Sequence, residues 1–350
     1  MTVPEAMLAI RTRAAYSRSP DVALLGVRGE DAQAALEALL PSRLFLRDAQ
    51  VKESLLLDEA GRPIADVLVC ADDEDFLLLV EGLDRAALRA HVEAHLPAEV
   101  RPELVDASET HEVISLHGPW AWHLVAAVLG EDMVALPYLN FFRIDAGLCV
   151  RAGKTGEYGY DLVIRRDAAA QVWASVEAAA RAMDALEVDA ATLSLCRFES
   201  WFFDPRFVPD DTTPLELQLS WRLDYGRDGW VGREAIDARR RVGVSRRRAC
   251  LLAEREVTVG DPVLFGDTEI GVVTRAERSP VLDRWVVAAM LDAAWAHGGI
   301  DRYRVGADRV PVRTMAPPLI DNRSLYVDPR RHTWAARDEL EARPLVRGVR

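Results

Sequence analysis

Two stretches of this chain carry the same succession of short strand and helix patterns, and this repetition constrains the fold more than any other feature. In the first stretch, residues 21–28 and 31–40 have the patterns of a strand and a helix, and further strand patterns precede an amphipathic helix over residues 84–96. The stretch from residue 111 to residue 185 repeats this arrangement. Because strands alternate with covering helices in both stretches, we predict two ferredoxin-like halves.

The pattern changes after Gly243, where short β-rich segments separated by Gly and Asp replace the helices. Strands at this spacing are typical of a small barrel or sandwich. We therefore predict an α+β fold in which two ferredoxin-like halves and a C-terminal β-barrel-like domain form a ring around a central cavity. The charged segment beyond Pro317 has little apolar periodicity, which indicates partial disorder. The predicted divisions are residues 1–98 for the first half, 99–243 for the second half, 244–320 for the C-terminal domain and 321–350 for the tail.

Charge and cysteine spacing argue against several classes of function. The formal net charge of -13 disfavours nucleic acid or an anionic membrane as a partner, because both attract clustered Lys and Arg. The four cysteines lie far apart without a Cys-x-x-Cys pair, so neither a metal site nor a disulfide framework is expected. No apolar run reaches membrane-spanning length. We expect a cytoplasmic protein with a small-molecule substrate.

Four short motifs follow one another between residues 153 and 235. They are Gly153-Lys-Thr-Gly-Glu-Tyr-Gly-Tyr-Asp161, Arg197-Phe-Glu199, Asp211-Thr-Thr-Pro-Leu-Glu216 and Gly232-Arg-Glu-Ala235. In this order and spacing they resemble the folate-binding T-protein family, which comprises the aminomethyltransferases of glycine cleavage and relatives that move one-carbon units onto tetrahydrofolate. The resemblance covers most of the chain and implies tetrahydrofolate as the cofactor.

The resemblance also implies positions for cofactor binding. A reduced pterin presents a row of donors that a carboxylate can accept in bidentate fashion, and the family match gives this role to Glu199. Glu157 and Tyr158 lie in the turn that borders the folate cavity in the family. Asp58 and Glu81 stand where the family has Asn side chains. These residues form the predicted cofactor-binding set.

The most consequential departure from the family lies at Ala65-Asp66. The glycine-cleavage enzymes have two consecutive Asp residues here, and the first is the carboxylate placed beside the folate nitrogens. Because Ala65 cannot stabilise a cation or relay a proton, Asp66 remains as the catalytic candidate. Strand alternation is expected to turn Asp66 to the face opposite the reactive position.

Further departures bring a charge and large rings into the region where the family leaves room for the cofactor. Lys154 replaces the family's Tyr, and Ser200-Trp201 replaces a small Ala-Gly pair, with Phe202 and Phe203 next. In one interpretation Trp201, Phe203 and Lys154 line a cavity reshaped for an apolar or aromatic substrate. In a second, the rings fill the place of folate, and in a third they are ordinary core between the halves.

We therefore expect a tetrahydrofolate-dependent one-carbon transferase or demethylase that moves a methyl or aminomethyl group from a specialised, apolar or aromatic substrate. The demethylases of the family resemble this chain in lacking the first Asp while keeping the second. A lipoyl carrier protein is not expected as a partner. The alternative is a repurposed T-protein fold that does not use folate, either a different enzyme activity in the same cavity or a folate-binding regulatory protein. His117 and His123 are expected to be structural.

Overall fold

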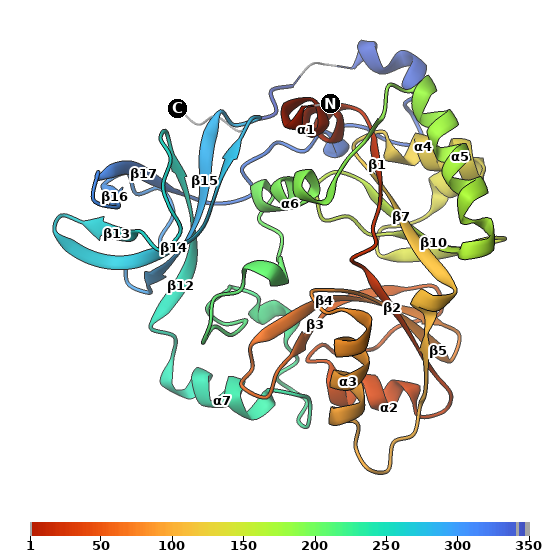
Figure 1. Cartoon of the computed structure of the whole chain (residues 1–350), viewed down its shortest axis with the longest axis horizontal. Coiled ribbons are helices and arrows are strands. Elements are labelled where there is room, and N and C mark those ends of the chain that lie inside the picture. The colour runs from red at the N-terminus through yellow and green to blue at the C-terminus, as the bar shows by residue number, and fades with distance from the viewer. Residues whose placement is uncertain (1, 341–342, 347–350) are drawn as a thin grey trace.

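The computed structural model describes residues 2–340 and 343–346 and has three lobes arranged around a central helix (Figure 1). Two lobes are sheets with helices packed on them, and the third is a closed barrel. This arrangement confirms the predicted α+β class with two ferredoxin-like halves and a C-terminal barrel. Among the described residues, no helix is both long enough and apolar enough to span a bilayer.

The first sheet is built from residues 23–106 and follows the ferredoxin-like order, with one strand added at an edge. Its elements are β2 (Ala23–Arg28), α2 (Ala32–Leu39), β3 (Val51–Leu57), β4 (Pro63–Asp72), β5 (Asp75–Glu81), α3 (Arg85–His95) and β6 (Glu103–Asp106). Side chains alternate along β4: Val67 and Val69 join the core with the helices, whereas Leu68 and Cys70 face the second sheet. Both faces of this sheet are therefore covered.

The second sheet repeats this order and takes in one strand from the start of the chain. The elements of this lobe are α1 (Val3–Thr12), β1 (Ala15–Arg18), β7 (His111–His117), α4 (Ala121–Leu129), β8 (Asn140–Ile144), β9 (Gly147–Arg151), β10 (Gly159–Arg165), α5 (Arg166–Ala182) and β11 (Leu186–Glu187). β1 lies between β7 and β11 and pairs with both. The sheets therefore divide the chain differently from the predicted boundary at residue 98, because β1 belongs to the second half and β6 to the first.

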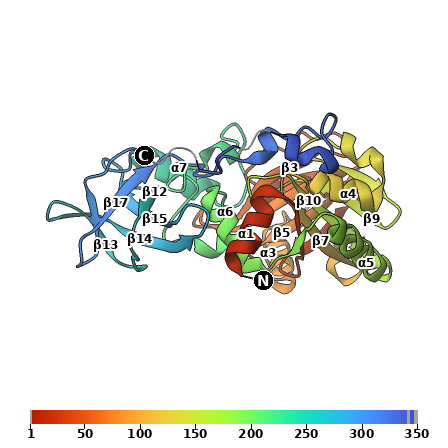
Figure 2. The same ribbon diagram turned by 90° about the horizontal axis from the view of Figure 1, so that it is seen from above.

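The two sheets pack face to face, and their helices lie on the outside. Leu68 and Leu79 of the first sheet meet Val113, Val150 and Val163 of the second in one apolar cluster. The helix α6 (Ala190–Glu199) lies between these sheets and the barrel, as Figure 2 shows from above. The junction of the two sheets with α6 is therefore the place where side chains from all three can meet.

The barrel begins after α7 (Arg233–Val242) and closes in the strand order β12-β15-β14-β13-β16-β17. Its strands are β12 (Arg246–Ala253), β13 (Pro262–Phe265), β14 (Thr268–Ser279), β15 (Arg284–Asp292), β16 (Tyr303–Val305) and β17 (Val310–Met315). Cys250, Leu252 and Val286 form one cluster with Phe198 of α6. The barrel is thus fixed to the centre of the molecule by apolar packing.

The described part of the tail packs on the second lobe, which differs from the predicted partial disorder. The Glu157 carboxylate accepts hydrogen bonds from the backbone N–H groups of Arg323 and Ser324, at 3.1 and 2.8 Å. Trp334 meets Trp120 edge to face, with ring centroids 5.6 Å apart. A buried carboxylate and a buried indole therefore hold this segment. Residues 341–342 and 347–350 of the predicted tail lie outside the described residues.

Candidate functional site

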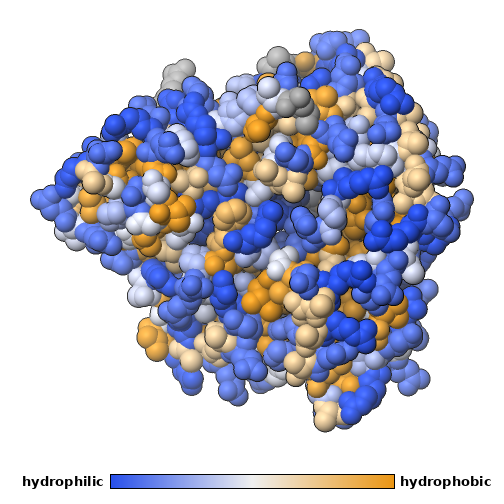
Figure 3. Space-filling view, viewed as in Figure 1, coloured by the Kyte–Doolittle hydropathy of each residue, from blue (hydrophilic) through white to orange (hydrophobic). Residues whose placement is uncertain are grey.

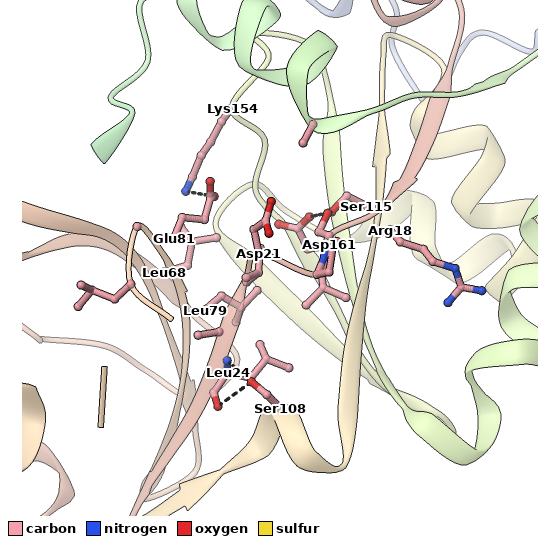
Figure 4. Close-up of a pocket in the computed structure, with 18 of the residues that line it drawn as sticks. Arg18, Asp21, Leu24, Leu68, Leu79, Glu81, Ser108, Ser115, Lys154 and Asp161 are labelled. Carbon is pink, nitrogen blue, oxygen red and sulfur yellow. Dashed lines mark hydrogen bonds and ion pairs between the residues drawn. The ribbon is translucent and has the colours of Figure 1, made fainter. Parts of the chain in front are cut away.

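A cavity of about 1050 Å³ lies between the two sheets and α6, and we call it the central cavity. Leu24, Leu68 and Leu79 form an apolar part of its wall on the first sheet, whereas Ser115 and Asp161 project from the second sheet (Figure 4). In the space-filling view, hydrophilic and hydrophobic residues both border the hollow near the centre of the molecule (Figure 3). Apolar walls with a few convergent polar groups are typical of small-molecule sites.

Lys154 is held at the wall of the central cavity between two carboxylates. Its Nζ atom lies 2.8 Å from Asp66 and 2.6 Å from Glu81. Each carboxylate also has a second cation, since Arg222 lies 2.7 Å from Asp66 and Arg197 lies 2.6 Å from Glu81. Charges therefore alternate along the row Arg222, Asp66, Lys154, Glu81 and Arg197, which we call the ion row.

The ion row fixes the protonation of its members. Burial acts to raise the pKa of Asp66, but Lys154 and Arg222 outweigh it and hold this pKa below its ordinary value. Burial also acts to raise the pKa of Glu81, but Lys154 and Arg197 outweigh it and lower this pKa. For Lys154, burial opposes the charge, yet the two carboxylates raise its pKa. Both carboxylates are therefore ionised and paired at neutral pH, and neither is free to accept a proton.

Strand register places Asp66 on the cavity side of the first sheet. Asp66 lies directly opposite Glu81 in the β4–β5 ladder, and paired side chains share one face of a sheet. Ala65 points the other way, into the core that the sheet forms with α2 and α3. Asp66 therefore lies on the face opposite Ala65, as strand alternation predicts, but that face is the cavity side. The expectation that position 65 faces the reactive region is wrong, so Ala65 does not remove a group from the cavity wall.

Asp161 of β10 reaches the central cavity with a hydroxyl rather than a cation as its partner. The Ser115 Oγ donates to its carboxylate at 2.6 Å, and the Ser19 hydroxyl lies 2.8 Å from that of Ser115. Burial raises the pKa of Asp161 to about 6. A carboxyl with this pKa is partly protonated near neutral pH, so it can donate a proton to a ligand.

His117 lies two residues beyond Ser115 on β7 and also lines the central cavity. Its side chain is nearly buried, and neither ring nitrogen has a hydrogen-bond partner within the part of the chain that the structure describes. Burial, and then the charge of Arg197, lower the pKa of His117 to about 4, so the ring is neutral. His117 is therefore not the satisfied structural histidine that the sequence favours, because it offers one donor and one acceptor to a ligand.

Glu199, the predicted pterin-binding carboxylate, lies outside the residues that line the central cavity. It is fully buried, and it forms a 2.7 Å ion pair with Arg11 of α1 and accepts a hydrogen bond from Ser279 of β14. The carboxylate therefore joins the N-terminal helix, α6 and the barrel. In this arrangement a pterin would reach Glu199 only by displacing one of these partners.

The other predicted cofactor residues are dispersed. Glu81 lies at the central cavity in the ion row. Glu157 holds the tail, and the Tyr158 hydroxyl donates to the Val327 carbonyl at 2.7 Å. Asp58 accepts from the Arg62 N–H at 2.8 Å in the turn between β3 and β4. None of these last three lines the central cavity.

The predicted substrate residues are divided between two cavities. Lys154 lines the central one, whereas Trp201 and Phe203 line a second cavity of about 550 Å³ between the segment after α6 and the barrel. Phe203 is buried in an apolar cluster with leucines of β3 in the first sheet, so it is a core residue, although this core does not lie between the halves. Trp201 is half-buried and stacks on Phe198, with ring centroids 5.8 Å apart. Neither ring enters the lining of the central cavity.

Sequence reasoning missed Asp161 and His117 as cavity residues and gave no role in the site to Arg197. Asp161 ends the Gly-rich motif, and Ser115 and His117 share strand parity, so each was visible as a polar residue on a strand. What the sequence does not contain is the pairing of β7 with β10, which sets Asp161 opposite Ser115. Only this register brings the three polar residues to one face.

Comparisons with known proteins agree with this architecture. The sequence profile of the GCVT N-terminal domain matches residues 3–227, and that of the glycine cleavage T-protein C-terminal barrel domain matches residues 246–321. An aminomethyltransferase of Thermosynechococcus vestitus is 27% identical over 319 residues, which are 87% of this chain and 83% of that protein. An aminomethyltransferase of Rubrobacter xylanophilus is 29% identical over 325 residues, covering 89% and 84%. The crystal structure of the glycine cleavage system aminomethyltransferase T from Bartonella henselae shares the fold, with a TM-score of 0.79 at 21% identity over 91% of this chain and 90% of that one.

Proposed function

This chain belongs to the glycine cleavage T-protein family, and from that premise we propose that it transfers a one-carbon unit to tetrahydrofolate in the central cavity. Tetrahydrofolate is the cofactor of the family's aminomethyltransferases. The donor that we propose is a specialised substrate with an apolar or aromatic body rather than the aminomethyl-lipoyl group of glycine cleavage. The contact of Lys154 with Asp66 supports this choice more than any other observation.

The central cavity fits a reduced pterin. Its volume of about 1050 Å³ is at the upper end of small-molecule sites. The unpartnered ring nitrogens of His117 and the carboxyl of Asp161 can pair with the polar edge of the ring system, and Leu68 and Leu79 offer an apolar surface to its flat face. When bound, tetrahydrofolate would supply the nucleophilic nitrogen that accepts the one-carbon unit.

Asp66 is poorly suited to act as a free base in this cavity. In the glycine-cleavage enzymes that the chain resembles, a carboxylate stands beside the reactive folate nitrogen. Here the carboxylate on the cavity side of β4 is already paired with Lys154 and Arg222, at 2.8 and 2.7 Å. Recruiting it would require the loss of a buried ion pair, which costs several kcal/mol on the order of 3–5. We therefore expect aminomethyl transfer from the lipoyl carrier protein to be weak or absent.

Transfer of a methyl group makes a smaller demand, because it needs proximity of donor and acceptor and, where the leaving atom is an oxygen, a proton for that oxygen. When the bond between the methyl carbon and the oxygen of a methyl ether breaks, the oxygen keeps the electron pair and needs a proton, whereas a methylsulfonium donor leaves as a neutral sulfide that needs none. Asp161, with its pKa raised to about 6, can protonate this oxygen, and through solvent at the cavity opening it would recover the proton that the acceptor nitrogen of tetrahydrofolate would lose. Asp161 is thus the proposed general acid, and Asp66 with Lys154 fixes the charge of the opposite wall.

One observation favours the alternative of a T-protein fold that does not use folate. Glu199 is the residue that the family match assigns to the pterin, and its carboxylate is engaged by Arg11 and Ser279. If folate were absent, His117 and Asp161 would serve a different substrate in the same cavity. A binding measurement separates the two possibilities, because only the first requires affinity for tetrahydrofolate.

The proposed choice of donor can be tested with two assays on the same preparation. The first follows ammonia release from the aminomethyl-lipoyl carrier protein in the presence of tetrahydrofolate, and the second follows formation of methyl-tetrahydrofolate from methoxyarenes and methylsulfonium compounds. We expect a low rate in the first assay and methyl transfer in the second. Lys154→Tyr should increase the first rate, because it removes the partner of the Asp66 Oδ2 atom while Arg222 keeps its contact with Oδ1. A first-assay rate equal to that of an ordinary T-protein would overturn the proposal.

A further inference from the structure

The second cavity, which is lined by Trp201 and Phe203, contains a buried cation that the one-carbon proposal does not use. Arg248 of β12 lines this cavity together with Gln218, Thr314 and His297. Among the residues that the structure describes, none lines both this cavity and the central one. Arg222 borders the second cavity and pairs with Asp66, which in turn pairs with Lys154 of the central cavity. The ion row therefore stands between the two cavities.

Arg248 is 7% exposed, yet no carboxylate lies within ion-pair distance of its guanidinium in residues 2–340 and 343–346. The other strongly buried arginines of the chain differ in this respect. Arg11 pairs with Glu199, Arg197 with Glu81, Arg222 with Asp66 and Arg275 with Glu277. Glu53 also lines the second cavity, but its contact is with Arg222, at 3.4 Å. Since buried charges in proteins are normally paired, Arg248 lacks an expected anion.

The surroundings of Arg248 determine which anion would fit. Its guanidinium lies over the Trp201 ring, 4.2 Å from the centroid. Burial, and then the charge of Arg275, lower the pKa of Arg248 to about 10, so it is still charged at neutral pH. The side-chain amide of Gln218 is already engaged, because it donates a hydrogen bond to the backbone carbonyl of Arg248 at 2.7 Å. The cavity thus presents a planar cation and an aromatic wall side by side, at a volume suited to a small molecule.

We propose that the second cavity binds the carboxylate of a small aromatic acid, with the carboxylate on Arg248 and the ring against Trp201. A guanidinium donates two parallel hydrogen bonds to a carboxylate, and the neighbouring indole favours a flat apolar body over an inorganic anion. This site goes beyond the one-carbon proposal and does not depend on it. Trp201 stands where the family has a small residue, so the aromatic wall is a property of this chain's own sequence.

The site can be tested with benzoate as the probe, by calorimetry and by the shift of the unfolding temperature of the full chain. We expect wild type to bind benzoate, Arg248→Met to bind it about 10- to 100-fold more weakly, and Trp201→Leu to lose several-fold in affinity. Arg247→Met is the matched control, because Arg247 is the exposed neighbour on the same strand, and it should bind as wild type does. Benzamide, which lacks the charge, should bind far more weakly than benzoate.

Folding of the Arg248 variant provides a separate check. Replacing an unpaired buried cation by a neutral side chain of similar length should raise the unfolding temperature of the ligand-free protein, and benzoate should raise that temperature in wild type only. Unchanged benzoate affinity in Arg248→Met, or no benzoate binding by wild type, would refute the proposal. Competition between benzoate and tetrahydrofolate would also refute it, because the carboxylate bound at Arg248 would then be that of the cofactor's glutamyl tail.

Discussion

Replacing Lys154 by Met removes the central member of the ion row and leaves two carboxylates facing each other. Asp66 and Glu81 are paired positions in the β4–β5 ladder, and their side chains are 2% and 27% exposed. Asp66 would keep Arg222, and Glu81 would keep Arg197 and some contact with solvent. We therefore expect a loss near the low end for a broken buried ion pair, about 3 kcal/mol in the free energy of unfolding at pH 7.

The pH dependence of this loss identifies its cause. The folded-state pKa of Asp66 is lowered, so the stability it contributes is complete above its unfolded-state pKa of about 3.9 and is lost as the pH falls below that value. Without Lys154 this pKa is depressed less, and the difference between wild type and variant should be full at pH 7 and shrink below roughly pH 4. Urea unfolding of both proteins at a series of pH values measures the difference directly.

Two variants serve as controls for Lys154→Met. Lys154→Arg keeps the charge and should recover most of the stability. Lys52→Met removes an exposed lysine of β3 and should change the free energy of unfolding by no more than about 0.5 kcal/mol. A Lys154→Met protein as stable as wild type at pH 7, or one whose deficit is the same at every pH, would show that the ion row does not act as its geometry indicates.

Three further outcomes follow from the structure. Asp161→Asn should abolish the decline that the wild-type methyl-transfer rate shows as the pH rises through about 6, which a pH–rate profile would test. Because the pKa of Asp161 is raised in the folded state, the same variant should be more stable than wild type above that pH, which unfolding at a series of pH values would test. Ala65→Asp should leave glycine-cleavage activity no higher than in wild type, and it should lower the free energy of unfolding by about 3 kcal/mol or more. The reason is that the new carboxylate would enter the core between the sheet and the helices α2 and α3. A soluble and more active variant would contradict this. Trp334→Ala should cost about 3–5 kcal/mol and expose the tail to limited proteolysis, whereas tail cleavage at the wild-type rate would show that the packing on Trp120 is unimportant.

The fold could be predicted from sequence because its signals are local. Alternating strand and helix patterns gave both ferredoxin-like halves, and Gly- and Asp-bounded strands after Gly243 gave the barrel. The boundary between the halves was less predictable, since β1 is placed by its pairing with β7 and β11, which lie about 100 residues or more further along the chain. A strand as short as β1, with four residues, carries little pattern of its own.

The site was harder to predict because its chemistry depends on partners that are distant in sequence. Lys154 was visible as a substitution, but its contact with Asp66 requires two sheets to meet. Glu199 was recognised from its motif, yet its pairing with Arg11 could not be predicted, because α1 itself was not predicted. The face on which Asp66 lies could have been derived from the apolar alternation along β4, in which Val67 and Val69 share the helix side with Ala65.

Calorimetric titration of the purified chain with tetrahydrofolate tests the central proposal most directly. We expect wild type to bind the cofactor, His117→Leu and Asp161→Asn to bind it about tenfold more weakly or worse, and the surface variant Asp132→Asn to bind it as wild type does. At about 1 mM tetrahydrofolate, even a site with a binding free energy of only roughly −4 kcal/mol would be half filled. If wild type showed no binding at this concentration, one-carbon transfer in the central cavity would be contradicted. The same conclusion would hold if wild type bound the cofactor and the His117 and Asp161 variants bound it equally well.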